Sequence, residues 1–299
     1  MQSNNFIFGS SRYSVGQLKT VKASKIRVWI NYIVLIAFSV FFLIPFFWMI
    51  VTAFKTPEQT YNAPEILLPA PWTAQNFIDV FNQSPVLSFL NNSIIVTVTS
   101  VIGAVFSATL AGYGFGRLKW KGRDAVFLLV LIGMMIPKQA IMVPVYLVFQ
   151  KLGMVDTLLP LILPSWFAAS MKGAFYIFTV RQFIMAIPHE IDEAASIDGC
   201  GPFRIYFNVI LPLLTPAIGS VLVFSFMENW NNFLDAIIYL NSEMKYTLAI
   251  GIQYFKMQTF TDWNKILCVS LISLVPAIIV FFIGQKRLVN GVNLSASKG

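Results

Sequence analysis

Residues 181–212 read RQFIMAIPHEIDEAASIDGCGPFRIYFNVILP, a long polar stretch set between strongly apolar segments. Pro188 suits the first turn of a helix, and the acidic residues that follow favour the positive end of the helix dipole. Gly199 stands where such a helix would end in a left-handed residue. Pro202 suits the start of a second short helix that runs to Pro212. The stretch therefore predicts two short helices joined by a tight turn.

The first of these helices is predicted to be amphipathic. Ile187, Ile191, Ala194 and Ala195 recur at helical spacing and would form one apolar face. Small residues on the helix would let another protein approach closely, and Glu193 offers a charge for a basic partner. The alternative is an interfacial helix that rests on lipid. Its acidic side chains disfavour that alternative, because anionic lipid would repel them.

The segments on both sides of this stretch predict an all-α integral membrane protein. Hydrophobic residues make up 57% of the chain and charged residues only 11%, whereas about a quarter of the residues in soluble domains are charged. A lipid bilayer is therefore the natural solvent, and a spanning helix needs about 20 mostly apolar residues. Six segments are predicted to be transmembrane helices: 30–53, 88–115, 125–149, 157–180, 212–240 and 266–284.

The lysine and arginine residues predict the orientation of these segments. With the N-terminus inside, fourteen of the 21 lysines and arginines fall in cytoplasmic segments and five in external ones. This N-in, C-in topology divides the chain into a cytoplasmic segment 1–29, a membrane domain 30–284 and a cytoplasmic tail 285–299. The stretch 181–212 would face the cytoplasm, and the Pro- and Asn-rich residues 54–87 would form an ordered external loop.

Residue content disfavours several classes of function. The net charge of +8 does not indicate nucleic-acid binding, because the basic residues flank apolar segments. Cys200 and Cys268 fall in a polar loop and an apolar helix and imply no disulfide framework. His189 is the one histidine in the sequence, so we expect no metal site and no enzymatic histidine set. The sequence has no Gly-x-x-x-x-Gly-Lys-Ser/Thr motif, so we expect no nucleotide or other cofactor on this chain.

Polar residues inside the apolar segments are candidates for a solute pathway. Lys172 lies in the fourth segment, where a buried charge is costly and suggests a function; the alternative is that its amine snorkels or binds a carbonyl. Trp230 and Asn231 lie in a polar stretch late in the fifth segment, and an aromatic face beside amides would suit a sugar. The alternative there is a helix end that meets water. The G-x-G-x-G run of residues 112–116 instead favours close helix packing.

The spacing within 181–212 resembles that of a known family. Glu193-Ala194-Ala195 is followed after three residues by Gly199, and after nine more by Val209-Ile210-Leu211-Pro212. This pattern resembles the EAA loop of ABC importer permeases, with Val209 in place of the usual isoleucine. Further stretches within residues 26–299 resemble the maltose-type, MalG-like branch of carbohydrate-uptake permeases. They are Phe54-Lys55-Thr56-Pro57, Ile187-Pro188, Ile197-Asp198-Gly199, Trp230-Asn231, Tyr246-Thr247-Leu248-Ala249 and Val289-Asn290-Gly291.

The resemblance implies the fold of a type I ABC importer permease in a bacterial inner membrane, together with a set of partners. These are a second, MalF-like permease, two copies of an ABC ATPase that bind ATP and Mg, and an extracytoplasmic sugar-binding protein. The ATPase would dock on the EAA loop to drive sugar import, and the C-terminal Lys298-Gly299 would reach between the ATPases. The residues that would couple to the ATPase are Glu193, Ala194, Ala195, Asp198, Gly199, Leu211 and Pro212.

The alternative function is a secondary transporter or channel that acts without an ATPase. It would need a proton or sodium relay, or a filter, built from intramembrane polar groups. Lys138 and Lys172 stand out within the apolar segments, and neither has an obvious acidic partner in the sequence. The sequence therefore favours the ABC permease, without identifying the sugar that it transports.

Overall fold

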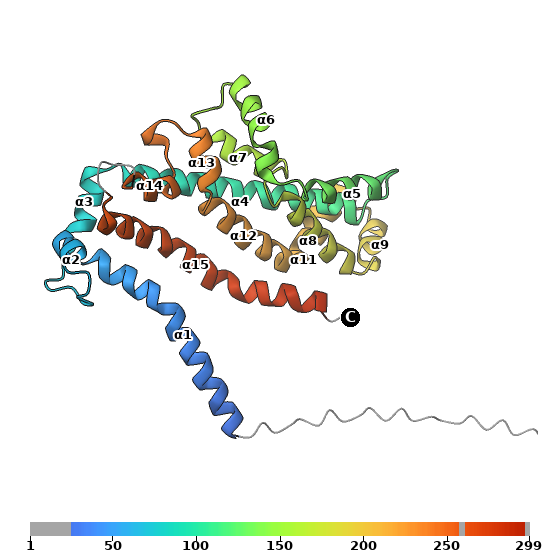
Figure 1. Ribbon diagram of the computed structural model, residues 1–299. Coiled ribbons are helices and arrows are strands. Elements are labelled where there is room, and N and C mark those ends of the chain that lie inside the picture. Colours follow the sequence, from blue (N-terminus) through green and yellow to red (C-terminus); the bar gives the residue numbers. More distant parts are fainter. Residues whose placement is uncertain (1–24, 257–260, 297–299) are drawn as a thin grey trace, which may run out of the picture. The chain divides into compact units, whose positions relative to one another are not determined.

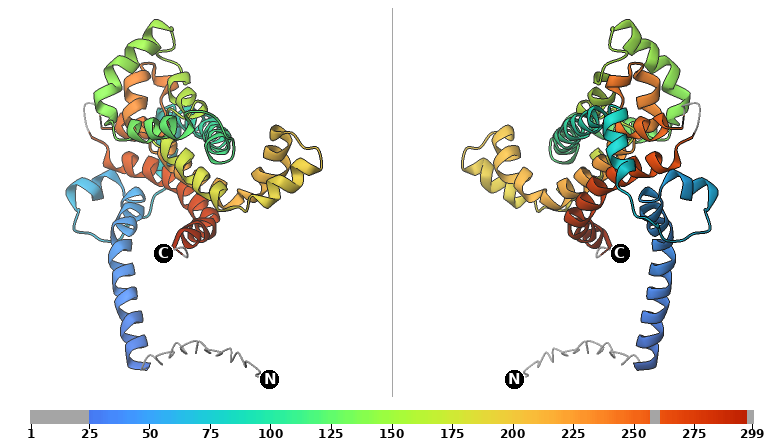
Figure 2. Two further views of the ribbon diagram at one scale, coloured as in Figure 1. Left: turned by 90° about the vertical axis from the view of Figure 1, so that its right-hand side faces the viewer. Right: turned by 90° about the vertical axis from the view of Figure 1, so that its left-hand side faces the viewer.

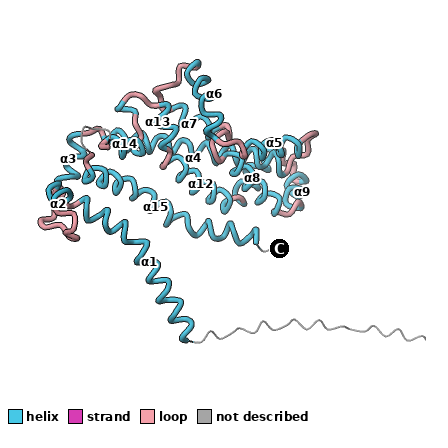
Figure 3. Tube along the Cα trace, in the orientation of Figure 1, coloured by secondary structure: helices cyan, strands magenta, loops and turns pink. Residues whose placement is uncertain are grey.

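The computed structural model describes residues 25–256 and 261–296 of the 299-residue chain. The regular secondary structure in these ranges is helical, with no strand (Figure 3). Residues 1–24 of the predicted N-terminal segment and the predicted Lys298-Gly299 tip lie outside the described residues. The first and last long helices extend past the predicted boundaries at 29/30 and 284/285, so both boundaries fall inside helices.

The helical elements follow one another with short connections (Figure 1). In chain order they are α1 (Lys25–Ala53), α2 (Pro57–Asn62), α3 (Gln75–Gln83), α4 (Val86–Gly116), α5 (Arg123–Gly133), α6 (Lys138–Lys151), α7 (Leu159–Trp166), α8 (Gly173–Ala186), α9 (Glu190–Ile197), α10 (Pro202–Ile205), a π-helical turn (Tyr206–Ile210), α11 (Leu211–Leu213), α12 (Thr215–Trp230), α13 (Phe233–Tyr239), a 3-10 turn (Glu243–Lys245), α14 (Leu248–Tyr254) and α15 (Trp263–Ala296).

The chain forms two compact units, Met1–Trp48 and Met49–Gly299. The described part of the first unit is the larger part of α1, and the second unit holds the remaining helices. Three described helices, α1, α4 and α15, are long and apolar enough to cross a membrane. Two bent groups, α5 with α6 and α10–α11 with α12, meet the same criterion jointly, which gives three to five candidate spans by length and composition.

Three of the six predicted segments coincide with continuous helices, namely 30–53, 88–115 and 266–284. The other three are interrupted. The segment 125–149 bends by 100° between α5 and α6, 157–180 is broken between α7 and α8, and 212–240 is broken between α12 and α13. The predicted interruption of 125–149 at Pro137 is confirmed, and the other two segments are also broken.

Local chemistry accounts for the breaks. Pro137 has no backbone N–H and disfavours the helical conformation at the preceding residue, so α5 ends before it. Ala168, between α7 and α8, has a positive φ of 53°, which interrupts a helix. Asn232 accepts a hydrogen bond from the backbone amide of Asp235 at 3.3 Å and so starts α13 anew. Non-helical backbone at membrane depth is tolerated where it is buried in protein or lines a cavity.

Helix α4 is the centre of the second unit, and α7, α8 and α12 pack against it. Its glycines let α8 approach closely, because a Cβ on Gly112 would lie 2.7 Å from Val180 and one on Gly116 would lie 2.8 Å from Ile184. Gly114 has nothing within 4 Å of its Cβ position. The predicted packing role is therefore confirmed for two of the three glycines, which share a helix face because they are four residues apart.

Residues 54–87, predicted to form an external loop, contain α2 and α3. Thr56 and Gln59 form a reciprocal capping box at the start of α2. The buried Asn76 of α3 donates to the carbonyls of Ala53 at 2.8 Å and Lys55 at 2.7 Å. These bonds fix the loop to the last residue of α1 and to the chain just after it.

Candidate functional site

The polar stretch folds into two short limbs that project from the neighbouring helices, and we call residues 187–213 the elbow (Figure 2). α9 forms the first limb, and α10, the π-helical turn and α11 form the second. Gly199 lies between them with φ +79°, which confirms the predicted left-handed residue. The Cys200 amide donates back to the Ala195 carbonyl at 3.0 Å and closes the turn.

The second limb is helical to Leu213 but not a uniform α-helix. Residues Tyr206–Ile210 form a π-helical turn directly before Pro212. Proline lacks an N–H and its ring clashes with the carbonyl four residues earlier in an α-helix. A wider π turn at this position relieves that conflict, and such turns are frequent at functional sites.

The prediction of one apolar face on α9 is confirmed for two of its four residues. Ile187 and Ala195 pack against the buried core formed by α4, α8 and the second limb. Ile191 and Ala194 are exposed. Asp192 is turned inward instead, because a buried arginine binds it.

The outward surface of the elbow combines acidic and apolar side chains. Glu193, Asp198 and Gly199 are exposed there. Ile197 at the end of α9 is 86% exposed, and Phe203 at the start of the second limb is 74% exposed. Of the other predicted coupling residues, Ala194 and Pro212 are exposed, while Ala195 and Leu211 are partly buried.

Arg117, which the sequence reading did not select as a site residue, holds the first limb. It directly follows α4, and its side chain is only 3% exposed. Its Nε lies 2.9 Å from Asp192 Oδ2. Its Nη2 donates to the Ile187 carbonyl at 2.6 Å, and its Nη1 lies 3.0 Å from His189 Nδ1. The single histidine is therefore part of this contact.

Two further residues of α4 hold the second limb. The Tyr113 hydroxyl donates to the Pro202 carbonyl at 3.1 Å, and the hydroxyls of Thr109 and Tyr206 lie 2.9 Å apart. Thr109, Tyr113 and Arg117 are spaced by four residues and so lie on one face of the helix. That spacing of hydrogen-bonding residues was a signal in the sequence that could have identified them.

A cavity of about 570 Å³ lies beside the broken helices. Lys138 forms an ion pair with Asp235 across it, and Asn232 donates to the same carboxylate at 2.8 Å. Glu228 accepts a hydrogen bond from the Tyr176 hydroxyl at 2.5 Å. The polar residues that line the cavity include Lys138, Gln139, Ser165, Ser170, Glu228, Asn229, Asn232, Asp235 and Tyr239.

The sequence-predicted pathway residues lie elsewhere. Trp230 is only 4% exposed, stacks on Phe226 and donates to the Ser273 carbonyl at 3.0 Å, so it packs in the core. Asn231 is exposed and bonds to its own helix, and neither residue lines the cavity. The Lys172 amine lies 5.9 Å from the centre of the Phe224 ring, also outside the cavity lining.

The prediction that Lys138 lacks an acidic partner is wrong. Asp235 lies 97 positions later in the chain, and the break between α12 and α13 turns its carboxylate toward the lysine.

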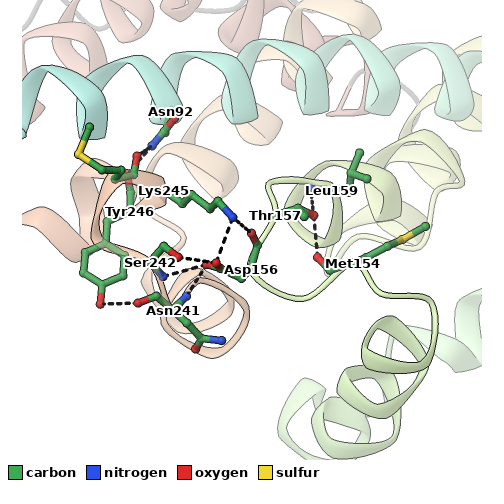
Figure 4. Close-up of polar contacts among 10 residues, drawn as sticks. Asn92, Met154, Asp156, Thr157, Leu159, Asn241, Ser242, Lys245 and Tyr246 are labelled. Carbon is green, nitrogen blue, oxygen red and sulfur yellow. Dashed lines mark hydrogen bonds and ion pairs between the residues drawn. The ribbon is translucent and has the colours of Figure 1, made fainter.

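A polar cluster lies near the Val86 end of α4 and ties two loops together (Figure 4). Asp156, with φ +60°, accepts hydrogen bonds from the amides of Asn241 at 2.9 Å and Ser242 at 2.8 Å. It also binds the Ser242 hydroxyl at 2.5 Å and the Lys245 amine at 3.0 Å. The Ser242 hydroxyl and amide, assisted by Asn241 and Lys245, hold the pKa of the Asp156 carboxyl well below its usual value. In the part of the chain that the structure describes, no group of three metal-ligating side chains occurs.

Known structures show which class of fold this is. The chain aligns with a subunit of a bacterial ABC transporter involved in the import of the acidic polysaccharide alginate, with a TM-score of 0.77 and 20% identity over 89% of this chain and 98% of that one. A second structure, of the alginate transporter in complex with an alginate pentasaccharide-bound periplasmic protein, aligns with a TM-score of 0.61 and 17% identity over 86% and 93% of the two chains. The fold is that of an ABC transporter membrane subunit.

Sequence comparisons identify the family. Residues 104–292 match the family of binding-protein-dependent transport system inner membrane components, and the chain belongs to this family. It is 34% identical to the probable ABC transporter permease protein YurM of Bacillus subtilis, over 85% of this chain and 83% of that protein. It is 29% identical to the diacetylchitobiose uptake system permease protein DasC of Streptomyces coelicolor, over 91% and 98%. The chain is therefore a membrane transport subunit rather than an enzyme.

Proposed function

We propose that this chain is one of two permease subunits of an ATP-driven sugar importer, and that its elbow docks on a separate ATPase. The elbow carries this proposal. It is a projecting pair of short helices with exposed Ile197 and Phe203 next to the exposed acid Glu193. The acidic side chains beside these apolar ones suit a protein partner rather than anionic lipid, and they favour a basic partner. The proposed coupling residues are Glu193, Ala194, Ala195, Asp198, Gly199, Leu211 and Pro212.

Basic residues support a cytoplasmic elbow with both termini inside. Arg117, Lys119, Lys121 and Arg123 lie in or beside the loop that follows α4, at the same end as the elbow. Short loops with this many cations remain on the cytoplasmic side. We propose six crossings of a bacterial inner membrane, in which each pair of broken helices forms one irregular crossing.

The names of relatives and the cavity both support a saccharide as the solute. Relatives include permeases named for arabinooligosaccharides and diacetylchitobiose. The cavity presents amides, hydroxyls and an internally compensated ion pair, groups that can replace the water around a polyhydroxylated solute. A second permease would complete the pathway, and an extracytoplasmic binding protein would deliver the sugar.

The energy would come from ATP and Mg bound on the ATPase subunits, outside this chain. Closure of two ATPases would move the elbow, and the elbow would move the helices attached to it. The cavity would then change its side of access and receive the sugar. Reopening after hydrolysis would release the sugar inside.

The buried ionisable groups support a second candidate, an ATPase-independent transporter. Glu228 and the Lys138–Asp235 pair lie in broken helices beside the cavity, and intramembrane ionisable groups often belong to ion relays. Family membership favours the first candidate.

The docking proposal is tested by purifying the tagged chain from its native membrane and measuring the co-purified subunit that carries a Walker A sequence. Glu193→Lys should reverse the charge at the interface, and Gly199→Val should strain the turn at φ +79°. Loss of an interface residue of this kind costs about 2 kcal/mol, so co-purification and ATP-driven uptake should fall about thirtyfold.

Glu65→Lys is the matched control, because Glu65 is an exposed acid in the predicted external loop. It should leave co-purification unchanged, and all three variants should insert at normal levels. Normal ATPase binding and uptake in both Glu193→Lys and Gly199→Val would refute the docking role.

A further inference from the structure

One helix binds both limbs of the elbow. Arg117 contacts the first limb through Asp192, Ile187 and His189, and Tyr113 contacts the second limb at Pro202. α9 itself is short, and its other anchors are its covalent link to α8, the packing of Ile187 and Ala195 against the core, and its contacts with the second limb. A force applied to the elbow tip would therefore pass into α4 through these contacts.

The Arg117 contact is specific in its chemistry. The guanidinium is nearly inaccessible and Asp192 is 19% exposed, so the two charges compensate each other away from bulk water. Removing one partner of such a pair leaves the other charge uncompensated. A lysine at this position could bind Asp192 but could not also reproduce the planar fork that reaches the Ile187 carbonyl and His189.

α4 has the stiffness to transmit a displacement. No proline interrupts Val86–Gly116, and Gly112 and Gly116 bring α8 into close contact beside the elbow. At its other end, the buried Ser93 hydroxyl accepts a hydrogen bond from the Leu248 amide at 2.7 Å. The Asn92 amide donates to the carbonyls of Met244 at 2.9 Å and Tyr246 at 3.0 Å. One rigid element thus joins the elbow to residues 244–248.

We propose that Arg117 is a positioning residue that fixes α9 to α4, so that movement of the elbow by the ATPase shifts α4 and residues 244–248 as one body. This inference rests on the proposed function for its energy source. The attachment of the elbow to α4 can be measured without an ATPase, so the two ideas fail separately.

The first experiment measures the attachment in the full chain. Cys200 lies in the elbow turn and is partly exposed, whereas Cys268 is buried. In membranes that hold the whole transporter, maleimide should label Cys200 several-fold faster in Arg117→Met and Asp192→Asn than in the parent. Arg117→Lys should be intermediate. Arg123→Met is the control, because Arg123 pairs with an exposed aspartate. Unlabelled Cys268 verifies that each variant is folded.

The second experiment measures transmission. Met244 is 62% exposed, so Met244→Cys in a Cys200→Ser background reports on the far end of α4. Trapping the purified complex with Mg-ATP and vanadate should change the maleimide labelling rate of Met244→Cys. Adding Arg117→Met should abolish this change, although the amount of co-purified ATPase stays the same; Arg123→Met should leave it intact.

Unchanged Cys200 labelling in Arg117→Met would overturn the attachment. An ATP-dependent change at Met244→Cys that persists in Arg117→Met, or that is absent in the parent, would overturn the transmission. If the parent complex contained no ATPase while Cys200 labelling still rose in Arg117→Met, the proposed function would fail and the attachment would stand.

Discussion

The two ends of α4 hold their neighbouring loops by different chemistry. At the elbow end, a buried arginine–aspartate pair and two close-packing glycines join α4 to α8 and α9. At the Val86 end, neutral hydrogen bonds from Asn92 and to Ser93 bind residues 244–248, and the charged Asp156 cluster nearby is partly open to solvent.

This difference in chemistry indicates which end of α4 resists deformation. Breaking a buried ion pair costs about 3–5 kcal/mol, whereas a typical neutral hydrogen bond contributes about 1 kcal/mol. The elbow end can therefore transmit force without yielding. The contacts at the other end are individually weaker.

The largest expected effect is at the elbow end. Gly112→Leu would drive a side chain into Val180 and toward the backbone of Arg181, 3.3 Å from the Cβ position. Overpacking of this kind costs about 1–3 kcal/mol or more, so the melting temperature in detergent should fall clearly. Gly114→Leu is the control, since nothing lies within 4 Å of its Cβ position. Equal melting temperatures for the two variants would contradict the claim that α4 packs closely at Gly112 and not at Gly114.

A smaller effect is expected at the Val86 end. Ser93→Ala leaves the buried Leu248 amide without its acceptor, which costs about 1–3 kcal/mol. Hydrogen exchange of that amide should accelerate accordingly. Thr99→Val serves as the comparison, because the Thr99 hydroxyl binds only carbonyls of its own helix. If both variants changed exchange at Leu248 to the same extent, Ser93 would not hold this segment.

The smallest effect is expected at Asp156. The pKa of this carboxyl lies below its unfolded value of about 3.9. Its contribution is therefore fully present above about pH 4 and is lost as the pH falls through the lower folded-state value. Because the Lys245 partner is nearly half exposed, Asp156→Asn should cost less than about 1 kcal/mol. It should speed hydrogen exchange at the Asn241 and Ser242 amides at pH 7.

Loss of protection in the parent already at pH 5 would contradict the lowered pKa. Exchange at the Leu248 amide, which is bound through Ser93 instead, should be unchanged in Asp156→Asn. A matching change there would mean that the cluster and the helix end form one unit.

The sequence by itself determined the local features of the chain. Composition required a bilayer, Gly199 and the prolines fixed a two-limbed turn, and the spacing from Glu193 to Pro212 identified the family. These features depend on residues close together in the sequence, where backbone preferences and helix spacing act directly. The breaks in the third, fourth and fifth segments had partial signals in the sequence, such as Pro137. Nothing in the sequence indicated the angles between the helices on either side of each break.

Only the tertiary structure decided which distant side chains meet. Arg117 and Asp192 are 75 positions apart, and Lys138 and Asp235 are 97 apart. It also moved Trp230 from a candidate pathway into the core, because its ring stacks on Phe226 and its N–H binds Ser273. Ion pairs and burial depend on how helices pack in three dimensions, and a periodic apolar pattern specifies that a helix is buried without specifying its neighbour.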